Sequence, residues 1–411
     1  MRKPIIPCLA RAVFVVVALA GIAACAGNAG GSSVPGTVLP DAAHRGTQSA
    51  RALPGEPTPT PSPSPIPGKP ACPPTPGVLN CNVNKNPNIL PISNPKPLSV
   101  SGYTAGDLRS AYGLPAANPL ALPSGPYVVV VDAYDDPTAE ADMAIYRARF
   151  GLPPCTSLTG CFVKVNQTGK PGPYPKYNAG WSDEISLDLA MVSAACPTCK
   201  IVLAEANDDN FDSLANITDV AASYKPGAVS DSFGVPEGQN GFDQGQVNQW
   251  DPHYTHPGVP IVASAGDQQL VEYPASSRNV ISVGGTTLVR NANTSRGWSE
   301  TPWAYSGTGC SRYEGTSSWQ SGWGCSTRAV ADVSFDADLN PGIAVYNSNT
   351  GGWQVMGGTS AGAPFVAGLF AAAGDYPSNA VGAMPLYMKF YKLNPLPGAF
   401  TLGTPNGLGA F

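Results

Sequence analysis

Apolar runs alternate with amphipathic segments through most of the chain after residue 100. Residues 127–132 (YVVVVD) form a continuous apolar run, and residues 137–150 have the spacing of an amphipathic helix. The same alternation predicts helices at 182–195 and 211–224, strands at 200–206, 228–231, 260–264 and 353–356, and a helix that begins at Ser360. Apolar strands separated by helices are typical of a parallel sheet covered on both faces. The pattern therefore predicts an α/β fold.

The first 97 residues follow a different pattern. Basic residues precede an apolar run at 12–24, which has the order of an export signal and is short for a membrane span. This run ends in Ala23-Ala24-Cys25, which resembles a bacterial lipobox, so residues 1–25 are interpreted as a signal peptide with Cys25 as a lipidation site. Cleavage without lipidation is the alternative. Residues 26–97 are rich in Pro, Ser and Thr and predict a disordered linker, which leaves 98–411 as the folded domain.

Export predicts an oxidising compartment, and the spacing of the cysteines agrees with it. Besides Cys8 and Cys25, eight cysteines remain, and they fall into four sequence-local pairs. Because short loops close at low entropic cost, we expect these pairs to be disulfides: Cys72 with Cys81, Cys155 with Cys161, Cys196 with Cys199, and Cys310 with Cys325. The Cys196-Pro-Thr-Cys199 pair has two alternatives, a redox dithiol and half of a zinc site, but no second C-x-x-C motif and no nearby histidine supports zinc.

Composition excludes some classes of function. Charged residues make up only 12% of the 411 residues and the formal net charge is -5, so no basic surface indicates nucleic-acid binding. The length and the 43% of hydrophobic residues are sufficient for a large buried core.

Residues 358–362 read Gly-Thr-Ser-Ala-Gly, a G-x-S-x-G nucleophile pattern that is centred on Ser360. A serine that caps a helix between packing glycines is the alternative. An α/β-hydrolase would need a histidine after the serine, and none follows Ser360. A triad of Asp132, His253 or His256, and Ser360 is disfavoured because both histidines lie in a Pro-flanked loop.

A pair of carboxylates is the better candidate for the base. Glu184 and Asp188 are four residues apart and therefore share one helix face, where they could share a proton beside the serine. An exposed acidic face is the alternative for this pair. Asp267 follows the predicted strand 260–264, and its carboxyl group, while protonated, could donate a hydrogen bond to a developing oxyanion. A turn residue after a strand is the alternative for Asp267.

Together these residues resemble the sedolisin family, the serine-carboxyl peptidases. The family's E-x-x-x-D helix, S-x-G-D segment and G-T-S-A-x-x-P motif occur here in the same order, at 184–188, 264–267 and 358–364. The resemblance implies a subtilisin-like fold, with Ser360 as nucleophile, Glu184 as general base, Asp188 as its supporting carboxylate and Asp267 as oxyanion-hole donor. It also implies that Ser232, Phe233 and Gly234 pair with the substrate backbone.

The expected function is that of an exported, monomeric endopeptidase that cleaves proteins or peptides in acid, outside the cell or at its surface. A catalytically impaired surface lipoprotein that uses the same fold for binding is the alternative. The family binds calcium near its C-terminus through aspartates, whereas no Asp or Glu follows Asp375, so we expect the calcium site to be absent or altered and predict no cofactor. Residues 26–97 are too rich in proline to form the family's folded prodomain.

Overall fold

The computed structural model describes residues 68–239, 241–322 and 324–389. The predicted signal peptide, the lipidation site at Cys25 and residues 26–67 of the predicted linker lie outside the described residues. Among the described residues, no helix combines the length and the apolar character that crossing a bilayer requires.

The core of the fold is an eight-stranded, mainly parallel sheet. Its strands lie in the order β12-β11-β9-β7-β4-β6-β5, and β15 also pairs with β11. The valines of β4 are fully buried, as expected of a strand covered on both faces. The strands span Tyr127–Ala133 (β4), Phe162–Val165 (β5), Lys200–Ala206 (β6), Ala228–Asp231 (β7), Ile261–Ser264 (β9), Ile281–Arg290 (β11), Trp298–Pro302 (β12) and Val333–Asp336 (β15).

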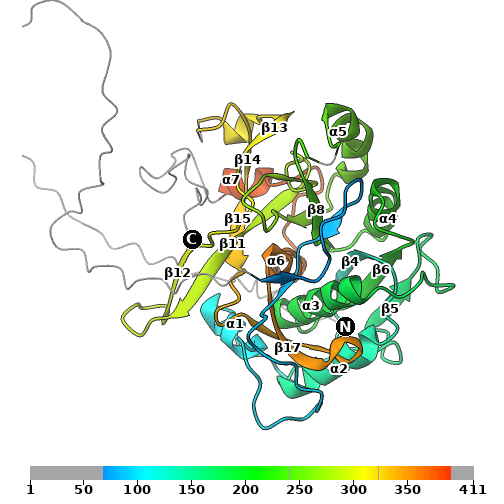
Figure 1. The fold of residues 1–411 in the computed structure, drawn as a ribbon, viewed down its shortest axis with the longest axis vertical. Coiled ribbons are helices and arrows are strands. Elements are labelled where there is room, and N and C mark those ends of the chain that lie inside the picture. The colour runs from blue at the N-terminus through cyan, green and yellow to red at the C-terminus, as the bar shows by residue number, and fades with distance from the viewer. Residues whose placement is uncertain (1–67, 240, 323, 390–411) are drawn as a thin grey trace, which may run out of the picture. The chain divides into compact units, whose positions relative to one another are not determined.

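Helices flank this sheet, which confirms the predicted α/β fold (Figure 1). The central helix α3 is buried along almost its whole length and packs on β4 and α6, while α4 packs on β4 and β6. The helices are Ala105–Ala111 (α1), Ala139–Arg149 (α2), Ala179–Ala195 (α3), Phe211–Ser223 (α4), Gln244–Trp250 (α5), Gly362–Ala373 (α6) and Met384–Lys389 (α7). Short 3-10 turns span Asp251–Tyr254 (η1), Ser318–Gln320 (η2), Ser348–Thr350 (η3) and Thr359–Ala361 (η4).

Smaller antiparallel sheets lie beside the main sheet. One has the order β1-β3-β17-β16, one has the order β10-β8-β2, and β13 pairs with β14. The predicted strand before Ser360 is therefore β17 of an antiparallel sheet rather than a strand of the parallel one. These strands are Lys69–Pro70 (β1), Asn80–Cys81 (β2), Asn84–Lys85 (β3), Phe233–Pro236 (β8), Glu272–Tyr273 (β10), Gly309–Gly315 (β13), Thr327–Val330 (β14), Ile343–Asn347 (β16) and Gly352–Gly357 (β17).

Strands β1 to β3 correct the predicted boundary of the linker. Residues 68–97 belong to the fold, because β2 pairs with β8 and β3 pairs with β17. In Figure 1 this blue segment runs beside β8 and continues to β17. These strands could not be recognised in the Pro-rich sequence, because a strand of two residues shows almost no hydrophobic periodicity.

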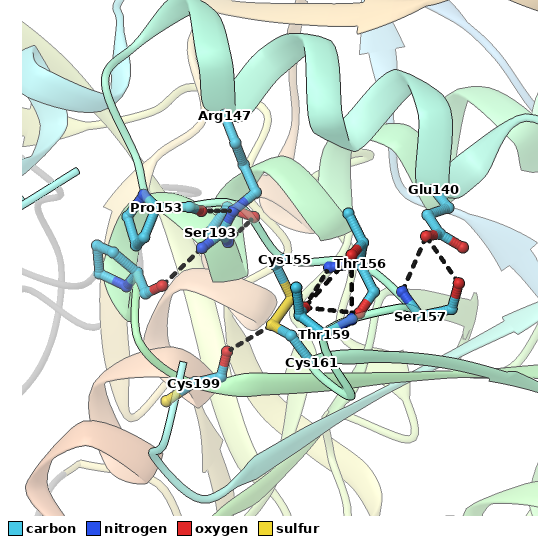
Figure 2. Close-up of a disulfide and its surroundings, with 11 residues drawn as sticks. Glu140, Arg147, Pro153, Cys155, Thr156, Ser157, Thr159, Cys161, Ser193 and Cys199 are labelled. Atoms are coloured by element: carbon cyan, nitrogen blue, oxygen red, sulfur yellow. Dashed lines mark hydrogen bonds between the residues drawn. A yellow bond between two sulfur atoms is a disulfide. The ribbon is translucent and has the colours of Figure 1, made fainter. Parts of the chain in front are cut away.

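All four predicted disulfides are present: Cys72–Cys81, Cys155–Cys161, Cys196–Cys199 and Cys310–Cys325. The C-x-x-C pair is thus a disulfide at the end of α3, not a zinc ligand pair. Figure 2 shows the Cys155–Cys161 bridge next to the buried guanidinium of Arg147. This guanidinium donates hydrogen bonds to the carbonyls of Pro153 and Pro197 and to the hydroxyl of Ser193. Arg147 therefore joins α2 to the C-terminal end of α3.

Candidate active site

Ser360 lies in the turn η4, between the end of β17 and the start of α6, and its side chain is buried. Its hydroxyl donates a hydrogen bond to the carbonyl of Ser232 at 3.2 Å. Its main-chain N–H points at the carbonyl of Asn82, with an N···O distance of 3.4 Å. Gly358 approaches the same carbonyl with a φ of 102°, where a Cβ atom would overlap both Asn82 and Asp267. Glycine is therefore required two residues before the serine.

Glu184 and Asp188 lie on α3, which packs against η4 and α6. Both side chains are fully buried, so the alternative of an exposed acidic face is wrong. Their carboxyl oxygens make no hydrogen bond of ordinary geometry. The Ser360 hydroxyl is nevertheless close enough to Glu184 to lower the pKa of that carboxyl group, and the Ser232 hydroxyl does the same for Asp188. The structure thus brings the serine and the acidic pair together.

The carboxyl groups of Glu184 and Asp188 both have raised pKa values. Burial is the main cause that raises the pKa of Glu184 well above its ordinary value, and the charges of Asp188 and Asp132 raise it further. Burial also raises the pKa of Asp188 well above its ordinary value. Two carboxyl groups this close in a buried site do not both ionise readily, so the pair retains a proton at a higher pH than an ordinary carboxyl group does.

Asp132 is a third buried carboxyl group near this pair, and it lies in β4. Burial, followed by the charge of Asp188, raises the pKa of Asp132 well above its ordinary value. The sequence analysis considered Asp132 only as a partner for a histidine. Asp132 ends the apolar run 127–132, near the carboxyl end of a parallel strand, and this position is the sequence signal that could have placed it at the site.

Asp267 follows β9 and contacts the residue before the nucleophile. Its Oδ1 atom accepts hydrogen bonds from the main-chain N–H of Thr359 at 2.8 Å and from the Thr359 hydroxyl at 2.7 Å. Its Oδ2 atom accepts one from the amide of Asn84 at 2.5 Å. Burial raises the pKa of Asp267 to about 7, against the opposing effect of these hydrogen bonds. Asp267 is therefore next to the candidate nucleophile Ser360, and its carboxyl group has a raised pKa.

Neither histidine of the described residues, His253 nor His256, joins this site. His253 Nδ1 lies 2.6 Å and His256 Nε2 lies 2.9 Å from the carboxylate of Asp219, which belongs to α4. Both histidines thus pair with an acid on another element, in agreement with the expectation that neither acts as the base.

The predicted subsite residues 232–234 line the position next to the serine. Ser232 accepts the hydrogen bond from Ser360, while Phe233 and Gly234 pair antiparallel with Cys81 and Asn80. Residues 80–84, which occupy this position, were not expected there from the sequence. Nor was the buried Glu272, whose carboxylate accepts a hydrogen bond from the amide of Asn82 at 3.0 Å.

The described residues contain no group of three or more His, Cys, Asp or Glu side chains placed to hold a metal ion. The expectation about the calcium site concerns the C-terminal region, part of which lies outside the described residues. It stays a prediction.

With this geometry established, comparison with known proteins decides the family. The model of the subtilase family, Peptidase_S8, matches residues 112–383, which include all four candidate catalytic residues. The chain belongs to the subtilase family. Within the subtilases, its curated relatives and a solved structure confirm the resemblance to the sedolisins.

Two curated relatives of this subtilase are bacterial. Xanthomonalisin from Xanthomonas sp. (strain T-22) is 36% identical over a match that covers 41% of this chain and 22% of the relative. Kumamolisin from Bacillus sp. (strain MN-32) is 29% identical, and the match covers 66% of this chain and 52% of the relative. The chain therefore spans about half or less of the length of these relatives.

A solved structure supports the fold. Pseudomonas sedolisin, a serine-carboxyl proteinase complexed with two molecules of pseudo-iodotyrostatin, has a TM-score of 0.62 and 22% sequence identity. The match covers 76% of this chain and 96% of that chain. The predicted subtilisin-like fold is thus confirmed.

Proposed function

We propose that this subtilase is a serine-carboxyl endopeptidase that cleaves peptide bonds through an acyl-enzyme on Ser360. The observation that carries the proposal is the burial of Glu184 and Asp188 beside Ser360, while His253 and His256 both pair with Asp219. Burial of two carboxyl groups lowers the stability of the folded chain. Their presence is explained if the serine needs a base to accept its proton. Proteins and peptides are the proposed substrates, in line with the names of the relatives.

The reaction follows from the positions of these groups. Rotation of the Ser360 side chain moves its hydroxyl from the carbonyl of Ser232 to Glu184, which accepts the proton as the oxygen attacks the substrate carbonyl. Asp188 and Asp132 oppose a second negative charge and keep Glu184 a competent proton acceptor. Glu184 then returns the proton to the leaving amine, and water hydrolyses the acyl-enzyme by the reverse proton path.

The developing oxyanion is stabilised by two donors. One is the main-chain N–H of Ser360, which points at a carbonyl oxygen in this structure. The other is Asp267, which can donate only while it is protonated. Because its pKa is about 7, this donor is present in acid and is lost above neutrality. We therefore propose that the protein cleaves peptide bonds in acidic conditions.

Export is part of the same proposal. Four disulfides are typical of proteins that fold in an oxidising compartment. With the signal-like segment of the sequence, they support a location outside the cell or at its surface. Lipidation of Cys25 stays a prediction.

The proposal is tested by a pH profile of peptide hydrolysis from about pH 3 to 8, the range in which carboxyl groups of ordinary and raised pKa titrate. Denatured casein and a quenched peptide library serve as substrates, and Ser360→Ala is compared with the parent chain. We expect activity that peaks in acid and is abolished by the substitution. A folded parent chain without activity at any pH would instead support the binding protein that keeps this fold.

A further inference from the structure

A second cavity lies between α5, the turn η1 and strand β13 (Figure 1), and none of the residues that line it belongs to the candidate active site. Its volume is about 400 Å³, which lies in the range of sites for small ligands. Its wall combines apolar surface with charged groups. The apolar side is formed by Val247, Pro252 and Tyr313, and the charged groups are those of Asp251, Arg278 and Glu314.

Arg278 is the positively charged side chain of this cavity. Its Nε atom donates a hydrogen bond to Oε2 of the buried Glu314 at 3.0 Å. Within residues 68–239, 241–322 and 324–389, its two terminal nitrogens have no hydrogen-bond acceptor, and 52% of the side chain is exposed. Glu314 therefore holds the guanidinium group in place while the terminal N–H groups are left for a ligand. Parallel N–H groups of this kind fit the two oxygens of a carboxylate.

Glu314 sets the net charge at this guanidinium group. Burial is the main cause that raises the pKa of Glu314 to about 7. The charge of Asp251 and, more weakly, that of Glu237 act in the same direction, while the charge of Arg278 opposes them. Burial also raises the pKa of Asp251. Both acids that line the cavity therefore keep their protons at a higher pH than ordinary carboxyl groups do.

The charge of the cavity depends on pH as a result. Arg328, in the neighbouring strand β14, also interacts with the charge of Glu314, but it is paired with Asp332. Below about pH 7 Glu314 is protonated and leaves the charge of Arg278 uncompensated, so an anion is attracted. Above this pH the ionised Glu314 neutralises Arg278 and repels an anion. The α-carboxyl group of a peptide has an ordinary pKa of about 3.5, so it is ionised throughout mild acid.

We propose that this cavity binds the C-terminal residue of a peptide in mild acid, with the terminal carboxylate on Arg278 and an apolar side chain against Tyr313 and Val247. The carboxylate supplies the charge that the guanidinium group lacks, and the apolar wall favours a hydrophobic residue. Binding at this cavity does not depend on catalysis at Ser360, although cleavage of a protein would produce ligands of this kind.

The test is an NMR titration of the full chain with Ser360→Ala, which prevents self-digestion. The probe is N-acetylphenylalanine, and N-acetylphenylalanine amide is the matched ligand without the negative charge. At pH 5 we expect the acid to bind at least about tenfold more tightly than the amide, the contribution of a hydrogen bond between charged groups. At pH 8 this preference is expected to be largely lost. Free phenylalanine is expected to bind no more tightly than the N-acetylated acid, because its ammonium group lies next to Arg278.

Two variants locate the binding. Arg278→Gln is expected to remove the preference for the acid over the amide. Arg312→Gln is the matched control, because Arg312 is an exposed arginine of β13 that does not line the cavity. If Arg278→Gln does not fold, as shown by its thermal melting, Arg278→Lys replaces it and is expected to weaken the preference, since lysine lacks the paired donors. Glu314→Gln has the shape of the protonated acid, so the affinity of this variant is expected to fall less between pH 5 and pH 8 than that of the parent.

Equal affinity for the acid and the amide at pH 5 would overturn the proposal, and so would an equal loss of affinity in Arg278→Gln and Arg312→Gln. Binding of the acid that is stronger at pH 8 than at pH 5 would reverse the expected sign and also overturn it. Tighter binding of free phenylalanine than of the N-acetylated acid would reject a peptide end as the ligand. Each of these results leaves the proposed function standing, because peptide cleavage through Ser360 is measured separately.

Discussion

Thr359 donates both its main-chain N–H and its hydroxyl hydrogen to a single oxygen of Asp267, at 2.8 and 2.7 Å. The residue adjacent to the nucleophile thus fixes the rotamer of the carboxyl group and leaves its other oxygen directed at Asn84. Any proton that Asp267 gives to an oxyanion would have to come from that other oxygen, so the hydrogen bond from Asn84 has to break before Asp267 can donate.

Asp267→Asn is predicted to remove the decline of activity above neutrality. The protonated Asp267 is lost as the pH rises through its pKa of about 7, whereas an amide donates at every pH. Asp267→Ala, which has no donor, is expected to lower kcat by roughly 10²–10³ at every pH. The measurement is kcat against pH for the three chains. A profile of Asp267→Asn that falls at the same pH as the parent would show that another group causes the decline.

Glu184→Gln is predicted to lower kcat by at least about a hundredfold, the contribution of a general base. The amide has nearly the same shape but cannot accept the proton of Ser360. His253→Ala and His256→Ala are the controls, since both histidines pair with Asp219 and their loss is expected to change kcat by less than about twofold. Single-turnover assays with a quenched peptide separate chemistry from binding. A histidine variant as inactive as Glu184→Gln would contradict the assignment.

The free energy of unfolding is predicted to fall as the pH rises from about 5 to 8. Burial raises the pKa values of Asp267, Glu272 and Glu205 to about 7, 8 and 9, whereas in the unfolded chain they lie near 4. Between these values the folded chain binds more protons than the unfolded chain, so each group lowers stability by up to about 1.4 kcal/mol per pH unit.

Thermal melting of Ser360→Ala between about pH 4.5 and 8, which spans the unfolded and folded pKa values, checks this prediction without self-digestion. Glu272→Gln is the matched variant, because it removes one of the titrating groups and is expected to flatten the dependence. A melting temperature that rises toward pH 8 would contradict the sign.

Much of the fold, and which residues gather at the candidate site, could be predicted from the sequence. Strands β6 and β7 have the predicted bounds, because continuous apolar runs in a covered parallel sheet leave little ambiguity. Ser360, Glu184 and Asp267 are brought together as the three motifs implied, and the short cysteine spacings predicted all four disulfides.

The parts that could not be predicted depend on contacts between residues far apart in the chain. Asn82 and Asn84 lie in a Pro-rich region without apolar periodicity, and only their pairing with β8 and β17 reveals their place. Glu272 follows no motif, and its burial becomes visible only once Gly234 and Gly266 are seen beside it. A sequence pattern shows only which residues are neighbours along the chain, whereas this cleft is formed by strands that are far apart in sequence.

The contacts at the C-terminal end of α3 also affect Glu184 and Asp188, which lie earlier in the same helix. Arg109 donates to the carbonyls of Ala194 and Ala195, Arg147 reaches Pro197, and a disulfide closes at Cys196. An α-helix is stiff along its axis and turns about 100° per residue, so slipping this end by one residue would swing Glu184 to a different face. The two arginines and the disulfide therefore fix the rotation of α3 about its axis, and with it the face of the helix on which Glu184 lies.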